Sequence, residues 1–157
     1  METLALTSTC RHITIRVATR HHTEFVDLTE RLRAFVAEAR IRAGLVNIQS
    51  LHTTTAVVVN EHEPLLLGDF AALLEEAAPA DAAYRHDDSS IRTVNVTPDE
   101  RVNGHAHCRS LLLGATVALN VVEGTLVLGR WQRVFLVELD GPREREISVL
   151  VLGEGGR

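Results

Sequence analysis

Polar side chains capable of acid–base or metal chemistry stand among long apolar stretches at well-separated places in the chain. Leaving a buried charge without its partner costs several kcal/mol, on the order of 3–5. We therefore expect these imidazoles and carboxylates to meet in a shared site. The set comprises His52-Thr53-Thr54, Asn60-Glu61, Asp69, Tyr84-Arg85-His86-Asp87, His107, Trp131-Gln132 and Glu138.

Two imidazoles with one or two carboxylates could bind a divalent metal ion, Mg²⁺ or Zn²⁺, because histidine nitrogen and carboxylate oxygen are suitable ligands. The alternative for each histidine is a hydrogen-bonded structural role, since no His-Glu-x-x-His motif is present. On a helix, His105 and His107 would diverge by about 200°, so only one can point into a given pocket, and we favour His107. The imidazoles and carboxylates of the set that could take part include His52, His86, His107, Glu61 and Asp69.

Two further pairs suit substrate binding. Asn60-Glu61 precedes a helix begun by Pro64, where backbone amides and the helix dipole favour anions, so a phosphate could bind there. Alternatively, these two residues cap the turn. Trp131 beside Gln132 could stack on an aromatic substrate or pack in the core.

Arginine supplies all 16 residues of the Lys+Arg total, because the chain contains no lysine. This excludes a lysine-dependent phosphate loop, a lysine Schiff base and the protein-kinase set. A bound phosphate must meet arginine, backbone amides or a metal ion. The charged run from Arg143 to Glu146 reads as a solvated strand face, with Arg143 as the candidate anion contact.

Composition favours a cytoplasmic protein that binds small molecules. The 157 residues suit a single domain over 1–157, and Cys10 and Cys108 lack paired spacing, so we expect reduced thiols. No apolar run reaches the ~18 residues of a membrane span, and no leader pattern begins the chain. A net charge of −5 without a basic stripe argues against nucleic acid as a partner.

Strands grouped at both ends with helices between them predict an α+β domain. Apolar alternation predicts a strand within residues 4–20, and helical spacing predicts a helix over 28–39, with Asp27 and Glu30 as a capping box and Gly44 at its end. A second helix should begin at Pro64 and stop before Pro79. The other expected strands are 45–50, 55–59, 115–122, 134–139 and 147–152.

A long loop from Ala80 to Gly104 should carry a short strand near 93–96 and lead to a helix capped by Asn103. Loops of this length are uncommon without a function. If residues 52–60 formed one strand, His52 and Asn60 would lie about 26 Å apart. Either the chain bends at His52-Thr53-Thr54, the groups serve different pockets, or a site is assembled between subunits.

Together these motifs resemble the YjbQ-like family, often described as the secondary thiamine-phosphate synthase family. The resemblance implies a mainly antiparallel β-sandwich with two to three flanking helices, and a homotrimer with histidine-rich pockets near subunit contacts. Arg130, Thr55 and His105 depart from the family pattern. The matching motifs are Asp27-Leu28-Thr29, Leu51-His52-Thr53-Thr54, Val59-Asn60-Glu61, Asp69, Tyr84-Arg85-His86-Asp87, Ala106-His107, Leu112-Leu113-Gly114, Gly124, Leu128-Gly129-Arg130-Trp131-Gln132, Glu138 and Asp140-Gly141-Pro142-Arg143.

The implied reaction joins a pyrimidine methyl pyrophosphate to a thiazole phosphate and expels pyrophosphate. The catalytic candidates are His52, Glu61, His86 and His107. The candidate metal ligands are His52, His86, His107, Glu61 and Asp69, of which Glu61 and Asp69 could instead balance charge. The substrate-binding candidates are Thr53, Thr54, Asn60, Trp131, Gln132 and Arg143. Two other functions stay open: a metal-dependent hydrolase of a phosphorylated or heterocyclic metabolite with Glu61 as base, and a non-catalytic trimer that sequesters a metabolite or metal.

Overall fold

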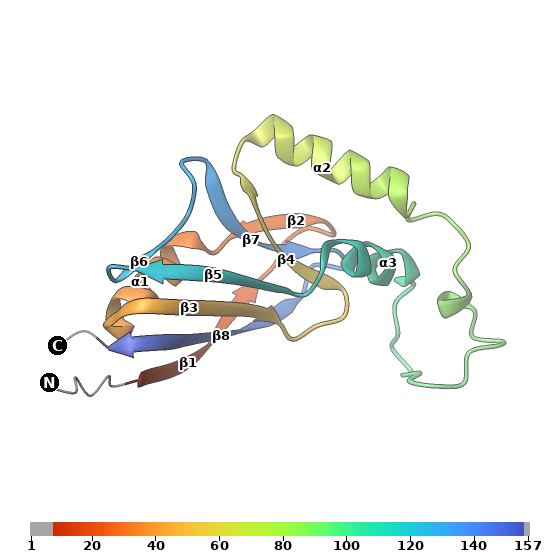
Figure 1. The fold of residues 1–157 in the computed structure, drawn as a ribbon. Coiled ribbons are helices and arrows are strands. Elements are labelled where there is room, and N and C mark those ends of the chain that lie inside the picture. Colours follow the sequence, from red (N-terminus) through yellow and green to blue (C-terminus); the bar gives the residue numbers. More distant parts are fainter. Residues whose placement is uncertain (1–7, 156–157) are drawn as a thin grey trace, which may run out of the picture.

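Alternating apolar side chains build two antiparallel sheets in the computed structural model, which describes residues 8–155 (Figure 1). The larger sheet has the order β1 (Ser8–Ala18), β8 (Glu144–Gly155), β3 (Ile41–Ser50), β5 (Thr116–Val122) and β6 (Thr125–Leu126). The smaller sheet has the order β2 (Glu24–Asp27), β7 (Gln132–Glu138) and β4 (Thr55–Glu61). The helices are α1 (Thr29–Ala39), α2 (Pro64–Ala77) and α3 (Gly104–Leu113), with a 3₁₀ turn η1 (Arg85–Asp87).

The smaller sheet is the middle layer, and apolar side chains cover both of its faces. One face, including Val57 and Leu136, packs with α1 against the inner face of the larger sheet. The other face, including Ala56 and Phe135, packs against α2 and α3. Burial of both faces explains why β4 and β7 are almost continuously apolar, and this architecture confirms the predicted α+β class.

The first helix begins and ends differently from the prediction. The Thr29 amide donates to Asp27 Oδ1 at 2.8 Å, but the N-cap is Leu28, without a side-chain cap bond, so the capping box was wrong. The helix ends at Ala39, and its C-cap residue Arg40 adopts the left-handed region, with φ 53°, directly before β3 starts. Gly44 therefore lies within β3, where the chain approaches β8 closely.

The strand and helix predictions otherwise hold with shifted ends. Residues 4–7 of the first predicted strand lie outside the described residues, and the short strands β2 and β6 were not foreseen. The expected strand near 93–96 is wrong, because this part of the long loop is irregular. Among residues 8–155, every helix is too short or too polar to cross a membrane.

The long loop is tied to the core at the start of α3. Asp87 Oδ1 accepts hydrogen bonds from the Asn103 and Gly104 amides, each at 3.0 Å. Asn103 is the N-cap residue, as predicted, but its side chain makes no cap bond and donates instead to Asp140 at 3.1 Å. A carboxylate from η1 thus performs the capping expected of Asn103, which fixes the loop beside α3.

Gly44→Ala should destabilise the protein by about 1–3 kcal/mol, because overpacking strains a well-fitted contact. A Cβ at Gly44 would lie 2.2 Å from the Leu152 carbonyl oxygen. The matched control is Gly68→Ala on α2, where a Cβ meets nothing within 4 Å, and which should stabilise by about 0.5–1 kcal/mol. Urea unfolding of both variants measures the difference, and equal stabilities would contradict the close approach of β3 and β8.

Candidate functional site

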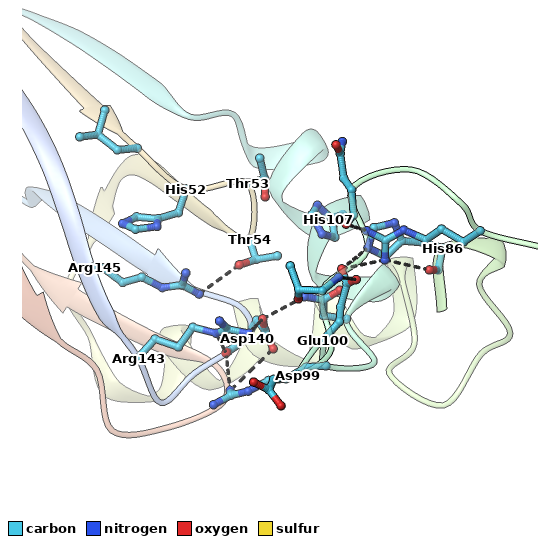
Figure 2. A pocket seen from close by; sticks show the side chains of 16 residues that line it. His52, Thr53, Thr54, His86, Asp99, Glu100, His107, Asp140, Arg143 and Arg145 are labelled. Atoms are coloured by element: carbon cyan, nitrogen blue, oxygen red, sulfur yellow. Dashed lines mark hydrogen bonds and ion pairs between the residues drawn. The ribbon is translucent and has the colours of Figure 1, made fainter. Parts of the chain in front are cut away.

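A polar cavity of about 500 Å³ opens where the β3–β4 turn, the start of β8, the long loop and α3 meet (Figure 2). His52, Thr54 and Arg145 lie on one side of it, and His86, His107 and Glu100 lie on the other. The lining residues are Leu51, His52, Thr53, Thr54, His86, Arg92, Asn95, Thr97, Asp99, Glu100, Arg101, Asn103, His107, Asp140, Arg143 and Arg145.

A buried ion pair joins Arg145, which lines the cavity, to Glu138 behind it. Glu138 is fully buried, and its carboxylate accepts a hydrogen bond from Arg145 Nε at 2.6 Å. Arg145 also donates to the hydroxyl of Thr54 at 3.0 Å, and Thr19 donates to Glu138 at 2.9 Å. Burial alone would raise the pKa of Glu138, but hydrogen bonds from Arg145 and the Asp140 amide outweigh it and lower the pKa.

The prediction that residues 143–146 form a solvated strand face is wrong at Arg145, which is buried. Its side chain is 4% exposed, because alternate residues of β8 point inward at this end. Glu144 is exposed, as expected for the opposite face. The alternation of exposed and buried side chains along β8 therefore continues through the charged residues 144–146.

His52 is held as a neutral imidazole by the backbone. The Glu146 amide donates to His52 Nε2 at 2.8 Å, so this nitrogen must carry its lone pair. Burial and the nearby Arg145 charge both lower the pKa of His52. The proton of the neutral ring is then on Nδ1, and Nε2 is occupied and unable to bind a metal ion in this arrangement.

His86 and His107 form a close imidazole pair on the other side of the cavity. Their ring centroids are 4.5 Å apart in an edge-on arrangement. Burial lowers the pKa of His107, and the neighbouring His86 and Arg92 lower it further. The buried His86 Nε2 has no hydrogen-bond partner within the described residues, and Glu100 Oε1 lies 3.8 Å away. At neutral pH, His107 can therefore act as a proton acceptor.

Four guanidinium groups line the same cavity, and carboxylates hold three of them in fixed orientations, Arg145 through the Glu138 pair described above. Arg143 donates to Asp140 Oδ2 at 2.7 Å, and Asp140 is 2% exposed. Arg92 pairs with Glu100 at 2.7 Å and also donates to carbonyl oxygens of the long loop. The positive charges are thus preorganised rather than free to move.

The β3–β4 turn bends the chain at His52-Thr53-Thr54, which brings all three residues onto the cavity. Sequence reasoning did not assign several other lining residues to the site, because nothing local shows that the long loop and the start of β8 face the same cavity: Arg92, Asp99, Glu100, Arg101, Asp140 and Arg145. The density of charged residues from 85 to 101 and the acidic end of an apolar strand at Glu138 were the available signals.

The remaining predicted site residues lie elsewhere. Glu61 and Gln132 pair across β4 and β7 at the end opposite Thr55, about 20 Å along the strand. Asn60 is exposed beside them, and Trp131 is 60% exposed with the Arg130 guanidinium 4.6 Å from its ring centre. Asp69, on α2, is also exposed. Within one chain, these residues do not reach the cavity formed around His52 and His107.

The two neighbouring histidines of α3 point to different places. His107 lines the cavity, whereas the buried His105 lies with its Nε2 3.2 Å from His22 Nε2. Burial, Arg109 and His22 lower the pKa of His105. His105 therefore belongs to the packing between α3 and the β1–β2 turn.

The expected metal ligands are dispersed within a single chain. His52, His86 and His107 share the cavity, but Glu61 and Asp69 lie outside it. Across residues 8–155, no group of three or more His, Cys, Asp or Glu side chains is arranged to hold a metal ion. A resident Mg²⁺ or Zn²⁺ thus stays a prediction, and we assign no chemical step to it.

The fold and cavity define an α+β sandwich protein with a histidine- and arginine-lined site. A family model described as UPF0047 protein YjbQ-like matches residues 13–154. The UPF0047 protein of Methanothermobacter thermautotrophicus is 37% identical over 136 residues, which cover 87% of each chain. The UPF0047 protein of Archaeoglobus fulgidus is 37% identical over 140 residues, covering 89% of this chain and 98% of the relative. The chain belongs to the UPF0047 YjbQ-like family.

Solved structures agree with this assignment. A YbjQ-like protein of unknown function from Sulfolobus solfataricus P2 has a TM-score of 0.85 and 37% identity, covering 94% of this chain and all of that one (100%). A hypothetical protein from Aeropyrum pernix K1 has a TM-score of 0.81 and 33% identity, covering 92% of this chain and 99% of the other. The YjbQ-like fold expected from the sequence is therefore confirmed.

Glu138→Ala should lower the free energy of unfolding by about 3–5 kcal/mol, because it leaves the buried Arg145 charge without its partner. The control is Glu146→Ala, whose carboxylate pairs with the exposed Arg16 and should contribute less than about 1 kcal/mol. Urea unfolding at pH 7 compares the two variants. Similar losses would show that the buried pair is no more important than the surface pair.

The same pair should make the stability depend on acid pH. The pKa of Glu138 lies below its usual value of 4.5 in the folded protein, so the pair stabilises fully above that pH. This contribution should disappear as the pH falls below 4.5 through the lower, folded-state pKa. Wild type and Glu138→Gln should therefore converge in stability at acid pH, and a constant difference down to pH ~2 would contradict this.

His52 should titrate below its usual pKa of 6.5 and carry its neutral-state proton on Nδ1. The lowered pKa follows from burial and Arg145, and the tautomer follows from the hydrogen bond donated by the Glu146 amide. Two-dimensional ¹H–¹⁵N NMR of the histidine rings across a pH series measures both properties. An Nε2-protonated ring at neutral pH would disprove the assigned contact.

Proposed function

We propose that the cavity is the active site of a thiamine-phosphate synthase-like transferase, which couples a pyrimidine methyl pyrophosphate to a thiazole phosphate. The observation that carries the proposal is the gathering of three imidazoles and four guanidinium groups on one polar cavity. Such a set combines proton transfer with the binding of anionic phosphate groups. This coupling is proposed as one activity of the site and can be secondary to another.

The reaction requires a departing pyrophosphate to be stabilised. The bond between the pyrimidine methyl carbon and the pyrophosphate oxygen breaks, and the oxygen keeps the electron pair. The thiazole nitrogen then forms the new bond to that carbon. Mg²⁺ would enter as part of the pyrophosphate substrate, and Arg143, held at Asp140, would contact a phosphate oxygen. Preorganised guanidinium groups favour this charge separation without reorientation.

The three histidines of the cavity would have different roles in the reaction, either transferring a proton or orienting a substrate. His107 has a lowered pKa and is neutral at pH 7, so it could accept a proton from the amino group of the pyrimidine as positive charge develops on that ring, and return it once the new carbon–nitrogen bond has formed. His86 packs edge-on against the His107 ring and would keep it in place. His52 can donate only from Nδ1 while Nε2 accepts the Glu146 amide, so we assign it to orienting the substrate beside Thr53 and Thr54.

A homotrimer is part of the proposal because some candidate residues have no place in the cavity of their own chain. Glu61, Asn60, Trp131 and Gln132 lie together at the far ends of β4 and β7. In an assembly with pockets at subunit contacts, these residues of one subunit would complete the cavity of the next. Trp131 and Asn60 are exposed, which leaves them accessible to a neighbouring chain.

His107→Ala should reduce coupling turnover at least ~10²-fold, the usual effect of losing an acid–base group. Purified protein is mixed with both substrates, with and without Mg²⁺ or Zn²⁺, and thiamine phosphate is quantified directly. The matched control is His22→Ala, an exposed histidine outside the cavity, which should keep wild-type turnover. Circular dichroism and gel filtration confirm that both variants fold and assemble as the wild type does.

Other results would favour the other two functions. Metal-dependent release of phosphate from one compound of a metabolite panel, in protein that shows no coupling, would favour a hydrolase with Glu61 as base. Tight metabolite or metal binding without turnover would favour a sequestering module. Equal coupling rates in wild type and His107→Ala would rule out the assigned role of His107.

A further inference from the structure

A second groove, of about 590 Å³, lies against the polar cavity. It is formed by the end of β3, the β3–β4 turn, the last turn of α3 and the residues leading into β5. Leu51, His52, Thr53 and His107 line both spaces. These four residues therefore stand at the boundary between the two spaces, so the groove is continuous with the candidate site.

The groove differs from the cavity in its chemistry. The cavity has four arginine and three acidic lining residues, whereas the described residues that line the groove include no Arg, Asp or Glu. Leu51, Leu111 and Ala115 supply apolar surface, and Leu111 is 84% exposed. Covering an exposed leucine with the apolar surface of a ligand favours binding, because both surfaces are removed from water. Such a lining suits an uncharged part of a ligand rather than a phosphate.

Two polar groups at the groove can orient a ring without adding a charge. The Ser110 hydroxyl donates to the Thr55 carbonyl oxygen at 2.8 Å, so its oxygen keeps lone pairs to accept another hydrogen bond. Gln49 is exposed at the groove and has a carboxamide that can both donate and accept. This combination matches the edge of a nitrogen heterocycle.

We propose that this groove is a second substrate subsite, which holds an uncharged heterocyclic ring while the polar cavity holds its phosphate group. The proposal rests on the proposed function and adds the place of the ring. It also assigns ring binding to Leu51, Leu111 and Ala115 of the same chain. The shared His107 and Thr53 then stand where ring and phosphate-bearing parts of the substrates meet.

The test separates ring binding from phosphate binding. The ring probe is the uncharged 4-methyl-5-(2-hydroxyethyl)thiazole, which has no phosphate, and the anion probe is inorganic pyrophosphate. Ala115→Phe should fill the groove and weaken thiazole binding at least tenfold, while pyrophosphate affinity stays at the wild-type value. The matched control is Ala118→Phe, at an exposed alanine of β5 outside the groove, which should leave both affinities unchanged. Ligand-observed NMR titrations measure the thiazole and calorimetry measures the pyrophosphate.

A second pair of variants keeps the test decisive if Ala115→Phe does not fold. Leu111→Ala removes a lining side chain, and Leu112→Ala removes its exposed neighbour, which does not line the groove. Only Leu111→Ala should weaken thiazole binding. Thiazole binding that is selectively lost in the groove variants supports the subsite even if wild type shows no coupling, in which case the transferase proposal alone fails. Wild-type protein that does not bind the thiazole, or groove variants that bind it as well as wild type, would overturn the subsite.

Discussion

The ion pair between Glu138 and Arg145 connects the two sheets at the place where the site forms. Glu138 ends β7 in the smaller sheet, and Arg145 is the second residue of β8 in the larger one. Both charged groups are buried, and removing them from water is costly. The hydrogen bonds that Thr19 and the backbone donate to Glu138 help to offset this cost. The pair also orients the Thr54 hydroxyl. One electrostatic contact thus fixes the sheets, the β3–β4 turn and one wall of the cavity together.

The opposite wall is built from irregular chain that needs its own anchors. The loop before α3 is long, but Asp87 holds it to the first amides of α3, and Arg101 holds it to the carbonyl oxygens of residues 140 and 141. Arg92 joins the loop to itself through carbonyl oxygens and Glu100. Charged side chains therefore replace strand pairing as the source of order, which positions His86 beside His107.

Polar and apolar regions meet at the centre of the proposed site. The cavity concentrates guanidinium groups and carboxylates, whereas the adjoining groove is lined mainly by leucine and small residues. This division suits substrates that combine a phosphate with a ring, because each part meets a matching environment. His52, fixed by the backbone, and His107, with its lowered pKa, lie between these environments. The arrangement is consistent with chemistry performed at the junction.

The sequence by itself determined the elements and the family, because apolar periodicity is local and the motifs of residues 52–54, 84–87 and 131–132 are ordered along the chain. It also favoured His107 over His105 as the histidine that points into a pocket, and His107 lines the cavity. Only the tertiary structure decided that Arg145 is buried and that Asp87 caps α3. It also placed Glu61 at the opposite end of its strand from the cavity. These outcomes depend on contacts between residues far apart in sequence, and local patterns contain no information on which distant groups will become neighbours.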